Sequence, residues 1–212
     1  EIEKLLVESG DARRLKMIFI ETPANPTNDL IDIEMCSAIA KRFSFPDKKV
    51  ILAVDNTYMG PLWQHPLKLG ADLVIYSATK YIGGHSDVIA GAVLGNRDLM
   101  KRVKTLRTFL GNMASPNTGW LLMRSLETLK VRMEQQAKNA EVIAQYLTKH
   151  PKVEKVYYLG LIHENSANYH TYKRQYLSPG AMLSFDIKGG EKEAFAFLNN
   201  LKLIQLAVSL GS

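Results

Sequence analysis

The segment "ADLVIYSATKYIGGHSD", residues 71–87, joins a buried apolar run to a polar loop that carries a single lysine. The apolar run "LVIY" (73–76) is typical of a strand covered on both faces. The loop places Lys80 between a threonine and a tyrosine, just ahead of Gly83 and Gly84. A solvated lysine needs no such setting, whereas an amine that bonds covalently to a cofactor does. The segment therefore predicts a buried strand that ends at a reactive amine.

Three further apolar runs have the same character: "MIFI" (17–20), "VILAV" (50–54) and "IAGAVLG" (89–95). Between the first two, Ile33, Cys36 and Ile39 recur at helical spacing, and Asp32 is placed to cap that helix. Continuous apolar strands that are separated by helices indicate an α/β fold with a mainly parallel sheet. In such a sheet, ligands bind beyond the carboxyl ends of the strands.

Polar side chains follow these strands where each strand ends. They are Glu21 and Asn25 after the first strand, Asp55 after the second, and Ser77, Thr79 and Lys80 after the third. Taken singly, each has a structural explanation, because Asp55 could begin a turn, the hydroxyls could cap a helix and Lys80 could be solvated. Since the carboxyl ends of parallel strands meet at one edge of a sheet, their combination favours a binding site there.

The second half has a different pattern. Residues 116–150 carry apolar positions at three-to-four spacing and predict one long helix. Further along, 153–158, 181–187 and 203–208 resemble strands and 191–201 a helix. We expect a large domain over 1–130 and a smaller α/β domain over 131–212, both incomplete, because both ends of the sequence look cut from a longer chain.

Composition narrows the function classes. The 212 residues are 46% hydrophobic and 23% charged, which is typical of a globular protein. The net charge of +6 is interspersed, and the basic helix over 97–107 favours a solvated face over a nucleic-acid surface. Cys36, the only cysteine, excludes an intrachain disulfide and fits core packing. With no membrane segment or signal peptide evident, we expect a cytoplasmic protein with neither a membrane nor a nucleic-acid partner.

The histidines and glycines are weaker candidates. His65, His163 and His170 lack metal-ligand spacing, so we expect no metal. His85 follows the lysine motif and is better suited to brace the loop than to do chemistry. Gly83 and Gly84 fit a phosphate cradle and a flexible turn equally well.

The combination of an amine, two hydroxyls and a carboxylate suits pyridoxal phosphate. A lysine can hold the cofactor's aldehyde as a Schiff base and later move protons. Hydroxyls and backbone N–H groups bind phosphate oxygens. A carboxylate beside the pyridine nitrogen keeps that nitrogen protonated, so that the ring withdraws electrons from the substrate.

Several motifs carry a family resemblance: "ETPANPT" (21–27), "VDNTY" (54–58), "GADLVIYSATKYIGGHSDVIAGAV" (70–93), "ETLKVRMEQQAKNA" (127–140) and "AVSLG" (207–211). Along essentially its whole length, the chain resembles the pyridoxal phosphate enzymes of cysteine and methionine metabolism. That group includes the cystathionine γ-synthases, the cystathionine and methionine lyases and O-acetylhomoserine sulfhydrylase. The resemblance implies a fold type I transferase-like cofactor domain.

Residue roles follow from the same motifs. The resemblance implies that Lys80 binds the cofactor covalently and is catalytic, and that Asp55 pairs with the pyridine nitrogen. It implies that Ser77 and Thr79 bind the phosphate, and that Asn25 lies near the phenolic oxygen. Ser209 and Val208 would lie at the substrate end. Family chains are about twice this long, so further phosphate and substrate-carboxylate ligands, and sites shared between subunits of a homotetramer (a dimer of dimers), fall outside this sequence.

We expect a lyase for a small sulfur-containing amino acid, most like methionine γ-lyase. Val208 stands where cystathionine γ-lyases of the family carry a glutamate, and an apolar residue suits a methionine side chain better than a charged one. Cystathionine γ-lyase, cystathionine γ-synthase and O-acetylhomoserine sulfhydrylase activities are the alternatives. A truncated pseudoenzyme or binding module is the non-enzyme alternative, although retention of Asp55, Ser77, Thr79 and Lys80 argues against it.

Overall fold

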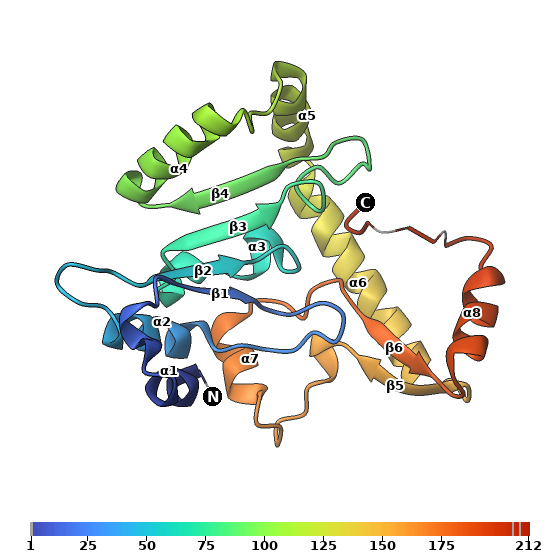
Figure 1. Ribbon diagram of the computed structural model, residues 1–212. Helices are drawn as coiled ribbons and strands as arrows, with labels where there is room; N and C mark the ends of the chain where they lie inside the picture. Colours follow the sequence, from blue (N-terminus) through green and yellow to red (C-terminus); the bar gives the residue numbers. More distant parts are fainter. Residues whose placement is uncertain (1, 205, 208) are drawn as a thin grey trace.

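The structure is a computed structural model that describes residues 2–204, 206–207 and 209–212 (Figure 1). Its strands are β1 (Met17–Glu21), β2 (Ile51–Asp55), β3 (Leu73–Ser77), β4 (Gly91–Gly95), β5 (Val153–Tyr157) and β6 (Ser184–Ile187). Its α-helices are α1 (Ile2–Glu8), α2 (Ile33–Arg42), α3 (Gly60–Trp63), α4 (Arg97–Leu110), α5 (Pro116–Leu126), α6 (Leu129–Thr148), α7 (Tyr169–Gln175) and α8 (Glu191–Asn199). Short 3₁₀ turns occupy Asp11–Arg13, Pro66–Leu69 and Leu159–Leu161.

The predicted mainly parallel sheet is confirmed. Strands β1, β2 and β3 pair in parallel in that order, and β4 adds antiparallel to β3. Strand β4 runs backwards because the loop over 78–90 turns the chain without a crossover helix, which a parallel neighbour normally needs. The described residues contribute these four strands to the sheet, and Figure 1 shows them side by side.

Helix α2 closes one face of the sheet over an apolar core. Asp32 accepts a hydrogen bond from the backbone N–H of Met35 at 3.0 Å, which confirms the predicted cap. Behind the cap, α2 buries one apolar stripe against the strands. The core comprises Ile18, Ile20, Ile33, Cys36, Ile39, Ala40, Phe43, Val50, Leu52, Val54 and Ala71.

The predicted long helix over 116–150 is two helices. Helix α5 ends at Leu126 and α6 begins at Leu129. The N–H groups of Glu127 and Thr128 each bond to a carbonyl three residues back, at 3.3 Å, so a tight turn redirects the chain. The apolar spacing continues across this turn, so periodicity alone gave no sign of the break.

The C-terminal part is partly as expected. Strands β5 and β6 form an antiparallel pair beside α6, and α8 follows β6 (Figure 1). The predicted strand over 203–208 was wrong, because its described residues form no strand. Instead, the chain beyond them returns to the Lys80 loop, where Gly211 accepts a hydrogen bond from Gln136 of α6 at 3.4 Å.

One core is shared by both halves of the chain. Tyr81 and Trp63 from the sheet side pack with Leu129 and Met133 of α6. Thr22 and Tyr176 join the halves again through a buried hydroxyl–hydroxyl hydrogen bond of 2.7 Å. The domain boundary near residue 130 stays a prediction, and contacts of this kind would make its two sides stiff relative to each other.

Burial of Cys36 gives a direct test of the α2 core. Only 3% of this residue is exposed, and burial, followed by the negative charge of Asp32, raises the pKa of the thiol. Less thiolate forms at pH 8, and the sulfur is covered as well. We expect Ellman's reagent to react with the folded chain at least about tenfold more slowly than with the same chain in urea. A Cys36→Ser variant gives the background, and equal rates in both conditions would contradict the packing.

Candidate active site

Lys80 lies in a tight loop directly after β3. Its N–H donates to the Ser77 carbonyl at 3.1 Å, and its own carbonyl accepts from Gly84 at 2.7 Å. Gly83 donates to the Ala78 carbonyl at 2.7 Å. The loop is therefore folded on itself by backbone hydrogen bonds, which fixes where the lysine side chain begins.

The lysine amine meets the C-terminal segment. Nζ of Lys80 donates to Oγ of Ser209 at 3.2 Å, although 129 residues separate the two in sequence. Gly211 makes this approach possible, because its φ is +85° and a Cβ there would lie 2.8 Å from the Tyr81 nitrogen. The structure thus brings together two of the residues that the sequence predicted for the site.

Asp55 and Ser77 are linked through Thr57. Oδ1 of Asp55 accepts from the Thr57 N–H at 2.9 Å, an Asx-type turn at the end of β2. The Thr57 hydroxyl in turn accepts from the Ser77 N–H at 2.9 Å. Within the described part of the chain, the Ser77 hydroxyl itself has no hydrogen-bond partner. It therefore remains available to donate to a ligand oxygen.

Two carboxylates stand at adjacent strand ends. Glu21 and Asp55 are register partners on β1 and β2, so their side chains leave the same face of the sheet. Burial and then the charge of Glu21 raise the pKa of Tyr58 to about 12. Burial also raises the pKa of Tyr76, and the charge of Asp55 adds to this effect. This edge of the sheet therefore favours a cationic group.

The other predicted site residues differ in how they are placed. The Thr79 hydroxyl donates to the Ala90 carbonyl at 3.2 Å and accepts from the Ala90 N–H at 3.0 Å, so here it ties the loop to the start of β4. Asn25 is exposed in the loop after β1, and its N–H donates to Glu21 at 3.4 Å. Val208 lies outside the described residues. The roles of these three stay predictions.

His85 and Cys36 behave as the sequence suggested. Nδ1 of His85 lies 2.7 Å from the Gly83 carbonyl and 3.4 Å from the Ser125 hydroxyl, which braces the loop. Cys36 lies in the core beneath α2. Among the residues that the structure describes, no group of three or more acidic, histidine or cysteine side chains could hold a metal ion. No helix within that part of the chain has the length and apolar character to cross a membrane.

The residues present fit pyridoxal phosphate. The Lys80 amine offers a covalent attachment point, and the two carboxylates favour a protonated pyridine nitrogen. The unpartnered Ser77 hydroxyl and the glycine-rich loop offer donors for phosphate oxygens. Lysine, carboxylate and hydroxyl thus come from neighbouring strand ends, as binding at the carboxyl edge of an α/β sheet requires.

Sequence reasoning missed three residues that hold this site. Thr57 bridges Asp55 and Ser77, and its position two residues after an aspartate at a strand end was a usable signal. Gly211 lets the C-terminal segment lie against the Lys80–Tyr81 backbone. Arg132 of α6 donates to the Tyr81 carbonyl at 2.9 Å. Both of these lie within motifs of the family resemblance, but the local pattern gave neither a role, because their partners are distant in the chain.

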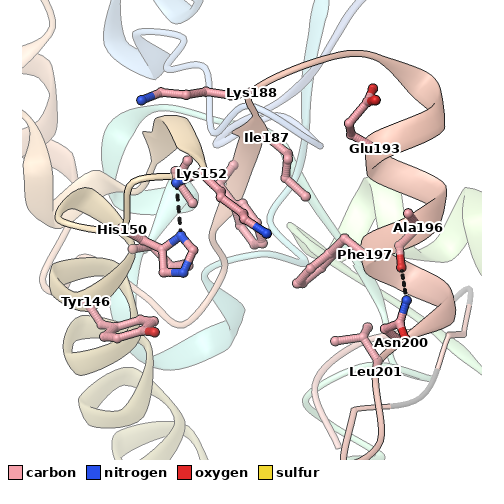
Figure 2. Close-up of a pocket in the computed structure, with 13 residues that line it drawn as sticks. Tyr146, His150, Lys152, Ile187, Lys188, Glu193, Ala196, Phe197, Asn200 and Leu201 are labelled. Atoms are coloured by element: carbon pink, nitrogen blue, oxygen red, sulfur yellow. Dashed lines mark hydrogen bonds between the residues drawn. The ribbon is translucent and has the colours of Figure 1, made fainter.

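A groove lies elsewhere, between the end of α6, the β5–β6 pair and α8 (Figure 2). Its volume is about 730 Å³, and its walls are largely apolar with His150 and Lys152 at one side. Figure 2 shows Phe197 and Leu201 on its opposite wall. None of the predicted site residues lines it. The groove is therefore separate from the site around Lys80.

Fold and site together place a lysine, two carboxylates and a hydroxyl at the carboxyl edge of an α/β sheet. The sequence matches the family of Cys/Met metabolism PLP-dependent enzymes over residues 5–212. The chain belongs to this family.

Individual relatives agree with that assignment. The chain is 43% identical to the L-methionine gamma-lyase of Fusobacterium nucleatum over 97% of its own length and 51% of the relative's. It is 45% identical to the human cystathionine gamma-lyase, covering 97% of this chain and 50% of that one. The crystal structure of cystathionine gamma synthase from Xanthomonas oryzae superposes with a TM-score of 0.88 at 37% identity, over 97% of this chain and 52% of the other. The chain thus spans about half the length of the curated relatives it matches.

Proposed function

We propose that the protein is a pyridoxal phosphate-dependent lyase that cleaves a carbon–sulfur bond of sulfur amino acids. The observation that carries this proposal is the Lys80 amine, held 3.2 Å from Ser209 at the same sheet edge as the Asp55 carboxylate. Family membership supports the cofactor. When bound, the cofactor withdraws electrons from the bond that is broken at the substrate's Cα.

Each residue has a distinct task in this proposal. Lys80 anchors the cofactor and then moves the proton at the substrate's Cα. Asp55 keeps the pyridine nitrogen protonated, with Glu21 adding negative charge beside it. Ser77 donates its hydroxyl proton to the phosphate, and Thr79 joins it if its hydroxyl turns away from Ala90. Asn25 would lie near the phenolic oxygen of the bound cofactor, and Ser209 and Val208 would contact the substrate.

We propose that the reaction is an α,γ-elimination like that of methionine γ-lyase. Methionine and water would give methanethiol, 2-oxobutyrate and ammonia. The apolar Val208 favours this substrate over cystathionine, whose distal ammonium would lack a partner there. The relatives and solved structures include a methionine gamma-lyase, a cystathionine gamma-lyase and a cystathionine gamma synthase, so cystathionine γ-lyase or γ-synthase activity is the first alternative. O-acetylhomoserine sulfhydrylase activity is the other alternative.

A substrate panel separates these activities. Full-length protein with added cofactor is assayed with methionine, with cystathionine, and with O-acetylhomoserine plus sulfide. We expect 2-oxobutyrate from methionine with a kcat/KM at least about tenfold above that for cystathionine, because an unpartnered charge costs more than one apolar contact. Turnover of cystathionine without any 2-oxobutyrate from methionine would contradict the methionine assignment but not the cofactor chemistry.

Replacement of Lys80 tests the central role. We expect Lys80→Ala to remove the yellow Schiff-base absorbance and to lower turnover at least about 10³-fold, because both the attachment point and the proton carrier are lost. Borohydride reduction of the wild type followed by peptide mapping should place the cofactor on residues 76–81. The exposed Lys68→Ala is the control. A label on another lysine, or near-normal turnover by Lys80→Ala, would sink the proposal.

We propose that the full protein assembles as a homotetramer, a dimer of dimers, around the face formed by α4 and α5. None of the residues of α4 is buried, and apolar side chains gather on both helices. The exposed set is Leu106, Phe109, Leu110, Met113, Trp120, Met123 and Leu126. A surface this apolar is typical of an interface that a partner covers.

We also propose that the chain divides into two domains near residue 130 and that the protein is cytoplasmic.

Light scattering on the full-length protein tests the assembly. We expect a mass of four subunits, since obligate interfaces are more hydrophobic than other surfaces and this exposed apolar face fits one. Phe109→Glu should shift the mass to smaller species, because it places a charge in the interface. Met35→Glu, at an exposed apolar residue on α2, should not. A single-subunit mass for the wild type would contradict the proposal.

A further inference from the structure

Arg132, in the first turns of α6, holds the loop that follows Lys80. Its Nη1 donates to the Tyr81 carbonyl at 2.9 Å, and its Nη2 donates to the Ser125 carbonyl at 2.9 Å. Its Nε donates to the Thr128 hydroxyl at 3.1 Å. One planar guanidinium therefore connects the end of α5, the start of α6 and the residue next to Lys80.

The break between α5 and α6 creates the need for this contact. A helix that ends leaves carbonyls without intrahelical donors, and Ser125 is one residue from the end of α5. Only long bonds of 3.3 and 3.4 Å, from the N–H and hydroxyl of Thr128, reach its carbonyl otherwise. The guanidinium supplies a short, charge-assisted bond to that carbonyl and still has donors for the Lys80 loop.

Gly84 leaves room for the guanidinium. It has a φ of +65°, and a Cβ built on it would lie 1.9 Å from Nη1 of Arg132. Any side chain at this position would displace the guanidinium. From the sequence, Gly83 and Gly84 fitted either a phosphate cradle or a flexible turn. The structure gives Gly84 a third role, which is to leave room for the Arg132 guanidinium.

The Arg132 guanidinium donates to two carbonyls and one hydroxyl, all of them neutral oxygens. No carboxylate forms an ion pair with it within the described part of the chain. Partial burial lowers its pKa, yet a guanidinium stays charged throughout the range in which proteins fold. A partly desolvated cation forms stronger hydrogen bonds with neutral oxygens than a fully solvated one. Loss of Arg132 would leave the carbonyls of Tyr81 and Ser125 without their short bonds.

We infer that Arg132 is a positioning residue that fixes the direction of the Lys80 side chain by clamping the Tyr81–Gly84 backbone to the α5–α6 junction. This inference rests on the proposed function of Lys80 as the cofactor lysine. A loop that is held before the cofactor arrives loses less entropy when the amine is attached. Arg132 acts through Lys80 and is itself not a catalytic residue.

The test uses Arg132→Ala and Arg132→Lys in the full-length protein, with Lys130→Ala as the matched control. Lys130 belongs to the same turn of α6, and its ammonium is exposed and paired only with Glu134 at 3.7 Å. Lysine cannot reproduce the planar fork, so Arg132→Lys should remain defective. Gly84→Ala gives an independent variant that displaces the guanidinium without changing Arg132.

Two readouts separate positioning from general stability. In the cofactor-free protein, amide hydrogen exchange of residues 80–85 should rise about tenfold or more in Arg132→Ala and Gly84→Ala, while exchange in β1 and β2 stays unchanged. The dissociation constant for pyridoxal phosphate, followed by the yellow absorbance, should rise about tenfold or more in the same variants and in Arg132→Lys. Lys130→Ala should match the wild type in both.

Three results would overturn the inference. Unchanged exchange in the loop would show that Arg132 does not hold it. Increased exchange across the whole chain with unchanged cofactor affinity would show that Arg132 contributes only to the overall stability of the fold. If borohydride mapping of the wild type leaves Lys80 unlabelled, the proposed function fails and the positioning role fails with it. The exchange measurement on the cofactor-free protein would still show whether the clamp exists, which distinguishes the two failures.

Discussion

The site depends above all on the burial of Tyr81, the residue next to Lys80. Only 1% of Tyr81 is exposed, and its ring packs edge-on against Trp63 at 6.1 Å and against Met133 of α6. Its hydroxyl has no hydrogen-bond partner within the described chain, a cost of about 1–3 kcal/mol. Burial also raises the pKa of this phenol. The anchoring of the ring is therefore maintained by apolar packing, and it fixes the backbone from which the lysine extends.

The buried Tyr81 ring lies where the parallel sheet meets helix α6. The parallel strands bring Glu21, Asp55 and Ser77 to one edge by geometry that any α/β sheet shares. Helix α6 reaches the same loop through Arg132, and the C-terminal segment reaches it through Ser209. Strand ends supply the charged and hydroxyl groups, and the helix with its following segment holds the loop between them.

The strands and the strand-end residues could be predicted because they depend on local sequence. A continuous apolar run and a polar residue at its end are both visible within ten residues. The direction of β4, the break at Glu127–Thr128 and the path of residues 209–212 could not, because distant contacts decide them. Thr79 illustrates the limit at the site itself, since its motif suggested a phosphate ligand while its hydroxyl is engaged by Ala90.

The hydrogen bond between Lys80 and Ser209 depends on the same packing. It closes a loop of 129 residues, so ordering it carries a large entropy cost that a single 3.2 Å hydrogen bond cannot offset. Other contacts of the same segment must therefore hold it in place. Leu210 packs on the shared core, and Gly211 lies against the Lys80–Tyr81 backbone at a distance that no larger residue would permit. The core that buries Tyr81 thus also seats the segment that meets the lysine amine. In the proposed enzyme, the cofactor's attachment point and the substrate end of the site are fixed by one set of packing contacts, so neither can shift without the other.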